Sequence, residues 1–137
     1  MKVPVENIVE LKVEHQFLQA YPLMKQLHAY LHLDTFLEFS KNMPYDGYHL
    51  FGLYHDTNIV ALAGISWREN LHNKRYVFVQ DFVTDANHRP HELGYNLLSY
   101  IHEWAKEEGA ICVMDSYIHV IVEDKQSSIF GAGNPIR

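Results

Sequence analysis

The sequence predicts an α+β fold in which helices flank a mixed, mostly antiparallel sheet. Three observations lead to this prediction: two helical patterns near the start, two strand patterns joined by a polar turn, and a later strand–loop–helix–strand order. Strands joined by a short turn pair antiparallel, whereas a helix between two strands covers one face of their sheet. A chain of 137 residues is one domain's worth, so residues 1–137 are expected to form a single domain.

The first third of the chain contains a short strand pattern and two helical patterns. Residues 8–13 alternate between apolar and polar side chains, as a half-buried strand does. Pro22 is expected in the first turn of a helix, because proline lacks the N–H that a helix interior needs. The apolar face of this helix would be Leu23, Leu27, Tyr30 and Leu31. Residues 34–43 predict a second helix that begins at an Asp34 cap and stops before Pro44.

The middle of the chain reads as a hairpin followed by a buried strand. Residues 48–55 and 59–67 are expected as strands, because both are apolar and a polar turn joins them. The run that begins at Tyr76 has the β-branched and aromatic density of a buried strand and continues past Asp81 to Val83.

A helix is expected from about His91 to Glu108. Its apolar stripe would be Leu93, Leu97, Ile101 and Trp104. Gly109 stands where a left-handed residue would end the helix. Residues 110–114 then read as a second short buried strand, in which Cys112 would be an inert core thiol.

Composition narrows the class of protein. The content of 47% hydrophobic and 20% charged residues is that of a soluble globular protein. A net charge of −6 and the lack of a Lys/Arg cluster argue against a nucleic-acid partner, and mildly suit a cationic or amine-bearing one. No apolar run approaches the length of a membrane helix and the N-terminus lacks the pattern of a signal peptide, so no membrane partner and a cytoplasmic location are expected.

The order strand, short loop, helix in residues 76–109 forms a standard cradle for a phosphorylated cofactor. The first turn of a helix has unpaired N–H groups and the positive end of the helix dipole, both of which favour an anion. The loop reads Arg89-Pro-His-Glu-Leu-Gly94. In this order, the stretch resembles the coenzyme A-binding core of the GNAT-type N-acetyltransferase superfamily.

The resemblance extends over about residues 20–116. The helix after Pro22 and the hairpin at 47–64 are similar to a GNAT subgroup that acts on small molecules, as are residues 69–71 and 115–116. The resemblance implies a GNAT-like fold and an acetyl-CoA-dependent N-acetyltransferase that acts on a small amine, with acetyl-CoA as co-substrate.

The resemblance also implies where the cofactor binds. Backbone groups of Phe82, Val83 and Thr84 would hold the pantetheine arm in a slot where this strand splays from the 110–114 strand. The diphosphate would lie at the loop and helix start, on Arg89, His91, Glu92, Leu93, Gly94 and Tyr95.

Glu92 departs from the family's loop pattern, which has a glycine at this place. Its side chain adds a Cβ and a negative charge beside an expected diphosphate. If the carboxylate turns to solvent, the main-chain N–H groups still serve, and if it turns inward, binding weakens. His88 and His91 flank Arg89 and would add positive charge when protonated, or are simply solvated loop residues.

Asp81 is the candidate catalytic base, because it interrupts an apolar strand next to the expected thioester. The alternative is a carboxylate at a strand bulge that is bonded to neighbouring backbone. Asp115 is a second candidate base, with an alternative role in a cap or turn. Tyr117 could replace the acid that the family usually has.

His28 and His32 lie four residues apart on a predicted helix, a spacing that can bind a metal. No acidic or cysteine partner accompanies them in the helical pattern, so exposed imidazoles are expected and no metal site is predicted. A histidine metal module remains a distant alternative.

The chain departs from the family after Ser116. The family has a helix with the usual tyrosine acid and two further strands, whereas residues 117–137 contain a β-branched run followed by a glycine-rich end. The C-terminal strands are therefore expected to be incomplete, leaving an unpaired edge at residues 110–114 or 117–122. Such an edge predicts a homodimer. Together with Glu92, it also keeps open a non-catalytic acyl-CoA-binding or regulatory remnant.

Overall fold

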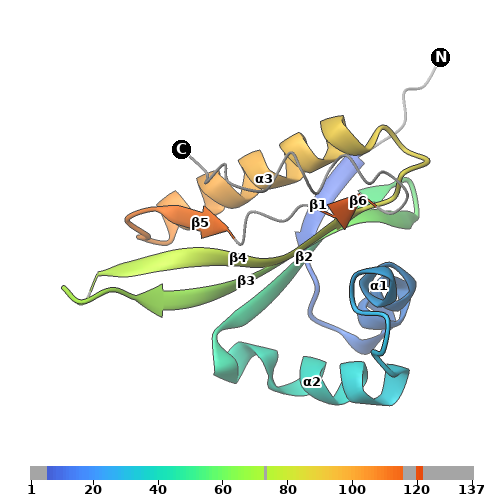
Figure 1. Cartoon of the computed structure of the whole chain (residues 1–137), viewed down its shortest axis with the longest axis horizontal. Helices are drawn as coiled ribbons and strands as arrows, with labels where there is room; N and C mark the ends of the chain where they lie inside the picture. The colour runs from blue at the N-terminus through green and yellow to red at the C-terminus, as the bar shows by residue number, and fades with distance from the viewer. Residues whose placement is uncertain (1–5, 73, 116–119, 122–137) are drawn as a thin grey trace.

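Six strands form one sheet in the parts of the chain that the computed structural model describes, residues 6–72, 74–115 and 120–121 (Figure 1). Five of them lie in the spatial order β1-β2-β3-β4-β5, and β6 pairs with β4. The strands are β1 (Glu6–Glu10), β2 (Tyr48–His55), β3 (Asn58–Glu69), β4 (Arg75–Thr84), β5 (Val113–Asp115) and β6 (Val120–Ile121). Strands β1 to β4 pair antiparallel, whereas β5 and β6 both run parallel to β4. The predicted mixed and mostly antiparallel sheet is confirmed.

Helices cover both faces of the sheet. The helices are α1 (Glu14–Leu27), α2 (Leu33–Asp46) and α3 (Pro90–Glu107). In Figure 1, α3 lies on one side of the sheet and α1 and α2 lie on the other. Two apolar clusters result, because each face of the sheet packs its own side chains against its own helices. On one face Leu93, Leu97 and Ile101 of α3 are buried, as their helical spacing predicts.

Helix α1 begins earlier than its proline indicates. The Gln16 side-chain oxygen accepts hydrogen bonds from the Lys12 and Val13 N–H groups at the start of the helix. The prediction that Pro22 lies in the first turn is therefore wrong, because this residue is in the helix interior. Burial of residues such as Phe17 and Met24 against the sheet stabilises the helix despite the lost backbone hydrogen bond. The helix ends at Leu27, which leaves Tyr30 outside it.

Helix α2 also passes the boundary that the sequence predicts. It continues through Pro44 to Asp46 and ends at Gly47, which takes the left-handed conformation with φ +75°. The expected Asp34 cap is wrong as well, because His32 is at the cap position. The local proline and aspartate signals are thus overridden by the apolar packing of residues such as Phe36 and Met43.

The hairpin and the later helix agree closely with the sequence. Strand β2 has the predicted bounds, and β3 is longer than predicted by a residue or two at each end. Helix α3 begins with Pro90 at its first position, and Gly109 follows it with φ +93°, as expected of a left-handed cap.

The end of the described chain differs from the prediction in two ways. Strand β5 is only three residues long, and Cys112 lies before it with an exposed thiol rather than in the core. Only Val120 and Ile121 are described beyond Asp115, so the predictions for Tyr117 and for the rest of the C-terminal segment lie outside the described residues. Within the described parts of the chain, no helix has both the length and the apolar character that a membrane span requires.

Candidate active site

Strand β4 contains a bulge at the place where its apolar alternation is broken. Val79 pairs with Ile65 and Asp81 pairs with Gly64, so Gln80 is the extra residue between two registers. A bulge bends a strand and redirects its side chains. The Asp81 carboxylate consequently faces the side of the sheet that carries α1, where it meets His28.

Two side chains from other elements hold the Asp81 carboxylate. The Tyr48 hydroxyl, from the start of β2, donates a hydrogen bond to Asp81 Oδ2 at 2.5 Å. His28 Nε2, just after α1, lies 2.8 Å from Asp81 Oδ1. The Asp81 side chain is 11% exposed and that of His28 is 51% exposed. The carboxylate therefore has one buried partner and one partner in contact with solvent.

Tyr48 acts as a hydrogen-bond donor and remains neutral. Burial raises the pKa of the Tyr48 phenol well above its ordinary value, and the negative charge of Asp81 and the hydrogen bond to it raise that pKa further. Ionising the phenol would place a second negative charge beside the carboxylate in a buried site. The Tyr48 proton is thus available to orient Asp81.

Gly64 provides the space that the Tyr48 side chain occupies. A Cβ at Gly64 would lie 1.7 Å from the Tyr48 hydroxyl oxygen and 3.2 Å from Asp81 Oδ2. No side chain larger than hydrogen fits there unless the tyrosine moves. The glycine on β3 is therefore part of the geometry that joins Tyr48 to Asp81.

A pocket of about 450 Å³ opens beside this group of side chains. Its volume falls within the range of about 300–1,000 Å³ that small-ligand pockets commonly have. Apart from His28, Gln80 and Asp81, the side chains of its walls are apolar or aromatic. The lining residues are Met24, His28, Ala29, Tyr30, Leu31, Phe36, Phe39, Tyr48, Gln80 and Asp81.

The structure changes the interpretation of the residues around the candidate base. Asp81 lies at a bulge, as the alternative interpretation of the sequence predicts. Its carboxylate is in contact with the side chains of Tyr48 and His28. Its catalytic role stays a prediction. His28 is exposed, as expected, but its imidazole also contacts the Asp81 carboxylate, a partner that the helical pattern did not indicate. Sequence reasoning missed Tyr48 entirely, since nothing local connects residues 33 positions apart on different strands.

The predicted cofactor residues lie on β4 and at the start of α3. Phe82, Val83 and Thr84 are buried at the end of β4. Within the described residues, the buried Thr84 Oγ1 has no hydrogen-bond partner. Leu93 is a core side chain and Tyr95 is 73% exposed, so these two residues can offer a cofactor only backbone or surface contact.

The loop before α3 has an internal ion pair. Arg89 takes the left-handed conformation with φ +52° at the cap position of α3. One guanidinium nitrogen of Arg89 donates to Glu92 Oε1 at 2.9 Å, and both side chains are more than half exposed. The Glu92 carboxylate is thus turned toward the cation that a diphosphate would need. Gly94 is buried in the second turn of the helix, and His91 is exposed in the first.

The predicted slot beside the end of β4 contains part of the chain itself. Strand β5 pairs with Val77, Phe78 and Val79, near the start of β4. Further along, β6 runs parallel to Val83 and Thr84, the backbone that the pantetheine arm was expected to use. The prediction of an open slot at Val83 and Thr84 is therefore wrong. The β-branched residues Val120 and Ile121 favour this extended pairing.

The remaining candidate residues, Asp115 and His88, are not among the side chains that line the Asp81 pocket. Asp115 lies in β5 opposite Val79 rather than in a turn. His88 Nδ1 lies 3.2 Å from Asp85 Oδ2, so this imidazole is near a carboxylate of its own loop. Among the described residues, no group of three or more His, Cys, Asp or Glu side chains could hold a metal ion.

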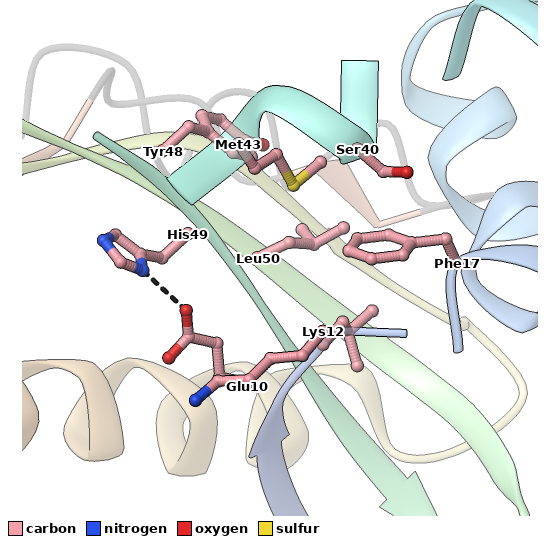
Figure 2. Close-up of a pocket in the computed structure, with 9 residues that line it drawn as sticks. Glu10, Lys12, Phe17, Ser40, Met43, Tyr48, His49 and Leu50 are labelled. Atoms are coloured by element: carbon pink, nitrogen blue, oxygen red, sulfur yellow. Dashed lines mark hydrogen bonds and ion pairs between the residues drawn. The ribbon is translucent and has the colours of Figure 1, made fainter. Parts of the chain in front are cut away.

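A second pocket, of about 340 Å³, lies where β1, β2 and α2 meet (Figure 2). His49 Nδ1 lies 2.6 Å from Glu10 Oε2 at one side of it, and Phe17, Met43 and Leu50 provide apolar walls. The hydrogen bond with His49 lowers the pKa of Glu10 below its ordinary value of 4.5. The Glu10–His49 pair joins β1 to β2, whereas Asp81 is on β4 and lines only the first pocket. Tyr48 lines both pockets.

Comparison with known proteins agrees with this geometry. The family model of the acetyltransferase (GNAT) family matches residues 11–127. An uncharacterized N-acetyltransferase of Bacillus subtilis (strain 168), YhdJ, is 32% identical over 104 residues, which cover 75% of this chain and 73% of that protein. The chain therefore belongs to the GNAT family of acetyltransferases.

Solved structures support the fold. Aminoglycoside N-acetyltransferase AAC(6')-Iy in complex with CoA aligns with a TM-score of 0.73 at 16% identity, over 93% of this chain and 83% of that one. The aminoglycoside acetyltransferase meta-AAC0020 from an uncultured soil metagenomic sample, in complex with sisomicin, aligns with a TM-score of 0.70 at 16% identity, over 90% and 81% of the two chains. At this identity the likeness concerns the fold.

Proposed function

We propose that this protein transfers an acetyl group from acetyl-CoA to a small amine, with Asp81 as the group that accepts the amine's proton. The observation that carries this proposal is the position of Asp81, at a bulge of β4 and in the wall of a pocket, where Tyr48 and His28 hold its two oxygens. A cytoplasmic location and a homodimer belong to the same proposal, the latter because β5 is the edge of the described sheet.

The side chains around Asp81 can bind an ammonium group and remove its proton. The carboxylate attracts the cation, and an amine must lose a proton before its nitrogen can attack a carbonyl carbon. His28, half exposed and in contact with Asp81, offers a path by which the proton reaches solvent. The nitrogen forms a bond to the acetyl carbon, the carbon–sulfur bond breaks, and CoA leaves as a thiol, with one proton released overall.

Acetyl-CoA supplies the activated acetyl group as a thioester. The start of α3 suits its diphosphate, because the first turn of a helix attracts anions and Arg89 lies beside it. The edge of β4 at Val83 and Thr84 suits the pantetheine arm only after β6 has left it. The buried Thr84 hydroxyl, which lacks a partner in the described part of the chain, is consistent with a ligand at that edge.

A non-catalytic acyl-CoA-binding or regulatory protein is the alternative. Two observations favour it: the Arg89–Glu92 ion pair and the presence of β6 at the expected pantetheine edge. Both would weaken cofactor binding, but neither alters the group formed by Tyr48, Asp81 and His28 in the acceptor pocket.

One experiment tests the proposal. Release of the CoA thiol from acetyl-CoA is measured with a panel of small amines, for the native protein, Asp81→Asn and the control Asp46→Asn. Asp46 ends α2 on the exposed surface, away from the lining of the Asp81 pocket. Loss of a general base lowers turnover by roughly 100-fold or more, whereas the control should retain activity. Turnover that is equal in all three proteins would contradict the role of Asp81, and binding of acetyl-CoA without turnover would support the alternative.

A further inference from the structure

We infer that the acceptor is a monoamine on an aromatic or apolar body, of the arylalkylamine class. It binds between the end of α1, α2 and the bulge of β4, with its ammonium group at Asp81 and its apolar body toward Phe39. This inference rests on the proposed function, since it names the class of amine that the same site takes.

The walls of the pocket favour an apolar body. Met24 and Phe36 are 3% and 2% exposed and form the buried part of the lining. Phe39 lies at a more open part of the pocket, 41% exposed, and its ring meets the Tyr48 ring edge-on with centroids 5.2 Å apart. A flat apolar ligand beside Phe39 would remove this exposed aromatic surface from water, which is favourable in proportion to the area buried.

The charges of the pocket favour a single ammonium group. Asp81 is the one carboxylate among the lining residues, and the other lining side chains are neutral apart from the titratable His28. A monoamine places its cation at this carboxylate and its body against the apolar walls. An amine with several cations would hold the others against Met24, Phe36 or Leu31, and burying an unpaired charge is costly.

A polyamine is the rival occupant, because Phe39 also lines a third pocket, which contains carboxylates that could bind further cations. Its lining residues are Asp34, Thr35, Glu38, Phe39 and Asn42. Glu38 is already 3.9 Å from Lys41 Nζ, and both side chains are more than two-thirds exposed. Solvated carboxylates of this kind contribute little to binding. The contacts of the Asp81 pocket therefore favour the arylalkylamine.

Acetyl transfer to phenethylamine, spermidine and neamine at saturating acetyl-CoA tests the inference. The expected kcat/KM for phenethylamine is at least about tenfold higher than for either polycation. A preference for spermidine or neamine would overturn the inference while leaving the proposed function intact. Saturation-transfer NMR of phenethylamine with the protein alone gives a readout that does not depend on turnover, and an absent signal at millimolar ligand would also overturn it.

Two matched variants on α2 locate the apolar body. Phe39→Ala should raise the KM for phenethylamine about tenfold or more and change the spermidine value little. Tyr45→Ala removes another aromatic ring of the same helix, 87% exposed and outside the pocket lining, and should leave both unchanged. Equal effects of the two variants would contradict binding beside Phe39. If no amine is acetylated but phenethylamine gives an NMR signal that Phe39→Ala removes, the proposed function fails and the inferred ligand class stands.

Discussion

The candidate site depends on contacts between single residues that lie far apart in the chain. Asp81 is oriented by Tyr48, and Tyr48 fits only because Gly64, on the strand between them, has no side chain. The three residues come from three adjacent strands, so a change at one of them is transmitted to the carboxylate. The glycine is therefore as informative a site for mutation as the carboxylate itself.

Gly64→Ala should lower the free energy of unfolding by about 2 kcal/mol, because the new methyl group overlaps the Tyr48 hydroxyl. Urea denaturation measures this change. The matched control is Gly52→Ala on β2, whose methyl group would meet Leu11 Cδ2 at 3.2 Å, the flexible end of a side chain that can move. We expect a smaller loss of unfolding free energy for the control. Equal losses would show that the Tyr48 side chain can move away from the new methyl group without an energetic penalty.

Glu10 makes a separate contribution to stability that depends on pH. Because His49 lowers the pKa of Glu10 in the folded protein, the ionised carboxylate stabilises the fold above the ordinary value of 4.5, and this stabilisation is lost as the pH falls through the lower folded value. Glu10→Gln should cost about 1 kcal/mol at about pH 6, since the pair is about a quarter exposed. The cost should be smaller at about pH 4, below the ordinary pKa of Glu10, than at about pH 6. Urea denaturation at both pH values checks this, and a cost that is constant with pH would contradict the assignment.

At the scale of elements, periodicity predicted the sheet and α3 well, whereas the proline and aspartate signals of α1 and α2 failed. Alternating and apolar runs are typical of strands, and the run at residues 48–55 predicted the bounds of β2 correctly. Pro22 and Pro44 were expected to bound helices, yet both lie inside them, because burial against the sheet outweighs a lost backbone hydrogen bond. Asp81 could be singled out from its own strand. Its partners could not, since His28 comes close only through the packing of α1 against the sheet.

The start of α3 leads to a prediction about cofactor affinity. Glu92→Gly should tighten acetyl-CoA binding about fivefold, or about 1 kcal/mol, because it releases Arg89 and removes a carboxylate from the expected diphosphate site. Isothermal titration calorimetry at low salt measures the affinity. In an Arg89→Ala background the gain should shrink, because no guanidinium remains to be released. Weaker binding by Glu92→Gly alone would mean that the carboxylate makes a useful contact.

Strand β6 leads to a second prediction at this scale. If β6 must leave Val83 and Thr84 before the pantetheine arm can bind, weakening that pairing should favour the cofactor. Ile121→Pro removes a backbone N–H and should tighten acetyl-CoA binding, whereas Ile121→Thr keeps the N–H and a β-branched side chain and serves as the control. Titration calorimetry compares the two. Unchanged or weaker affinity in Ile121→Pro would show that β6 does not compete with the cofactor.

At the scale of the whole molecule, the sheet has two different ends. Strand β1 pairs along its full length with β2, whereas β5 is short and forms the opposite edge of the described sheet. Around it, Ile111 is 54% and Met114 is 41% exposed. An edge strand with exposed apolar side chains tends to pair with another chain. The net charge of −6 opposes non-specific association, so pairing at this edge would have to be specific.

We therefore predict a homodimer that uses the β5 edge. Sedimentation velocity at tens of micromolar should show a dimer for the native protein and a monomer for Met114→Lys, because a charged side chain on an edge strand blocks edge-to-edge pairing. Leu71→Lys is the matched control, since Leu71 is 99% exposed in the loop between β3 and β4 and is not part of a strand. This control should remain dimeric. A native protein that sediments only as a monomer would refute the prediction. Dissociation by both lysine variants would instead place the interface at the β3–β4 end of the sheet.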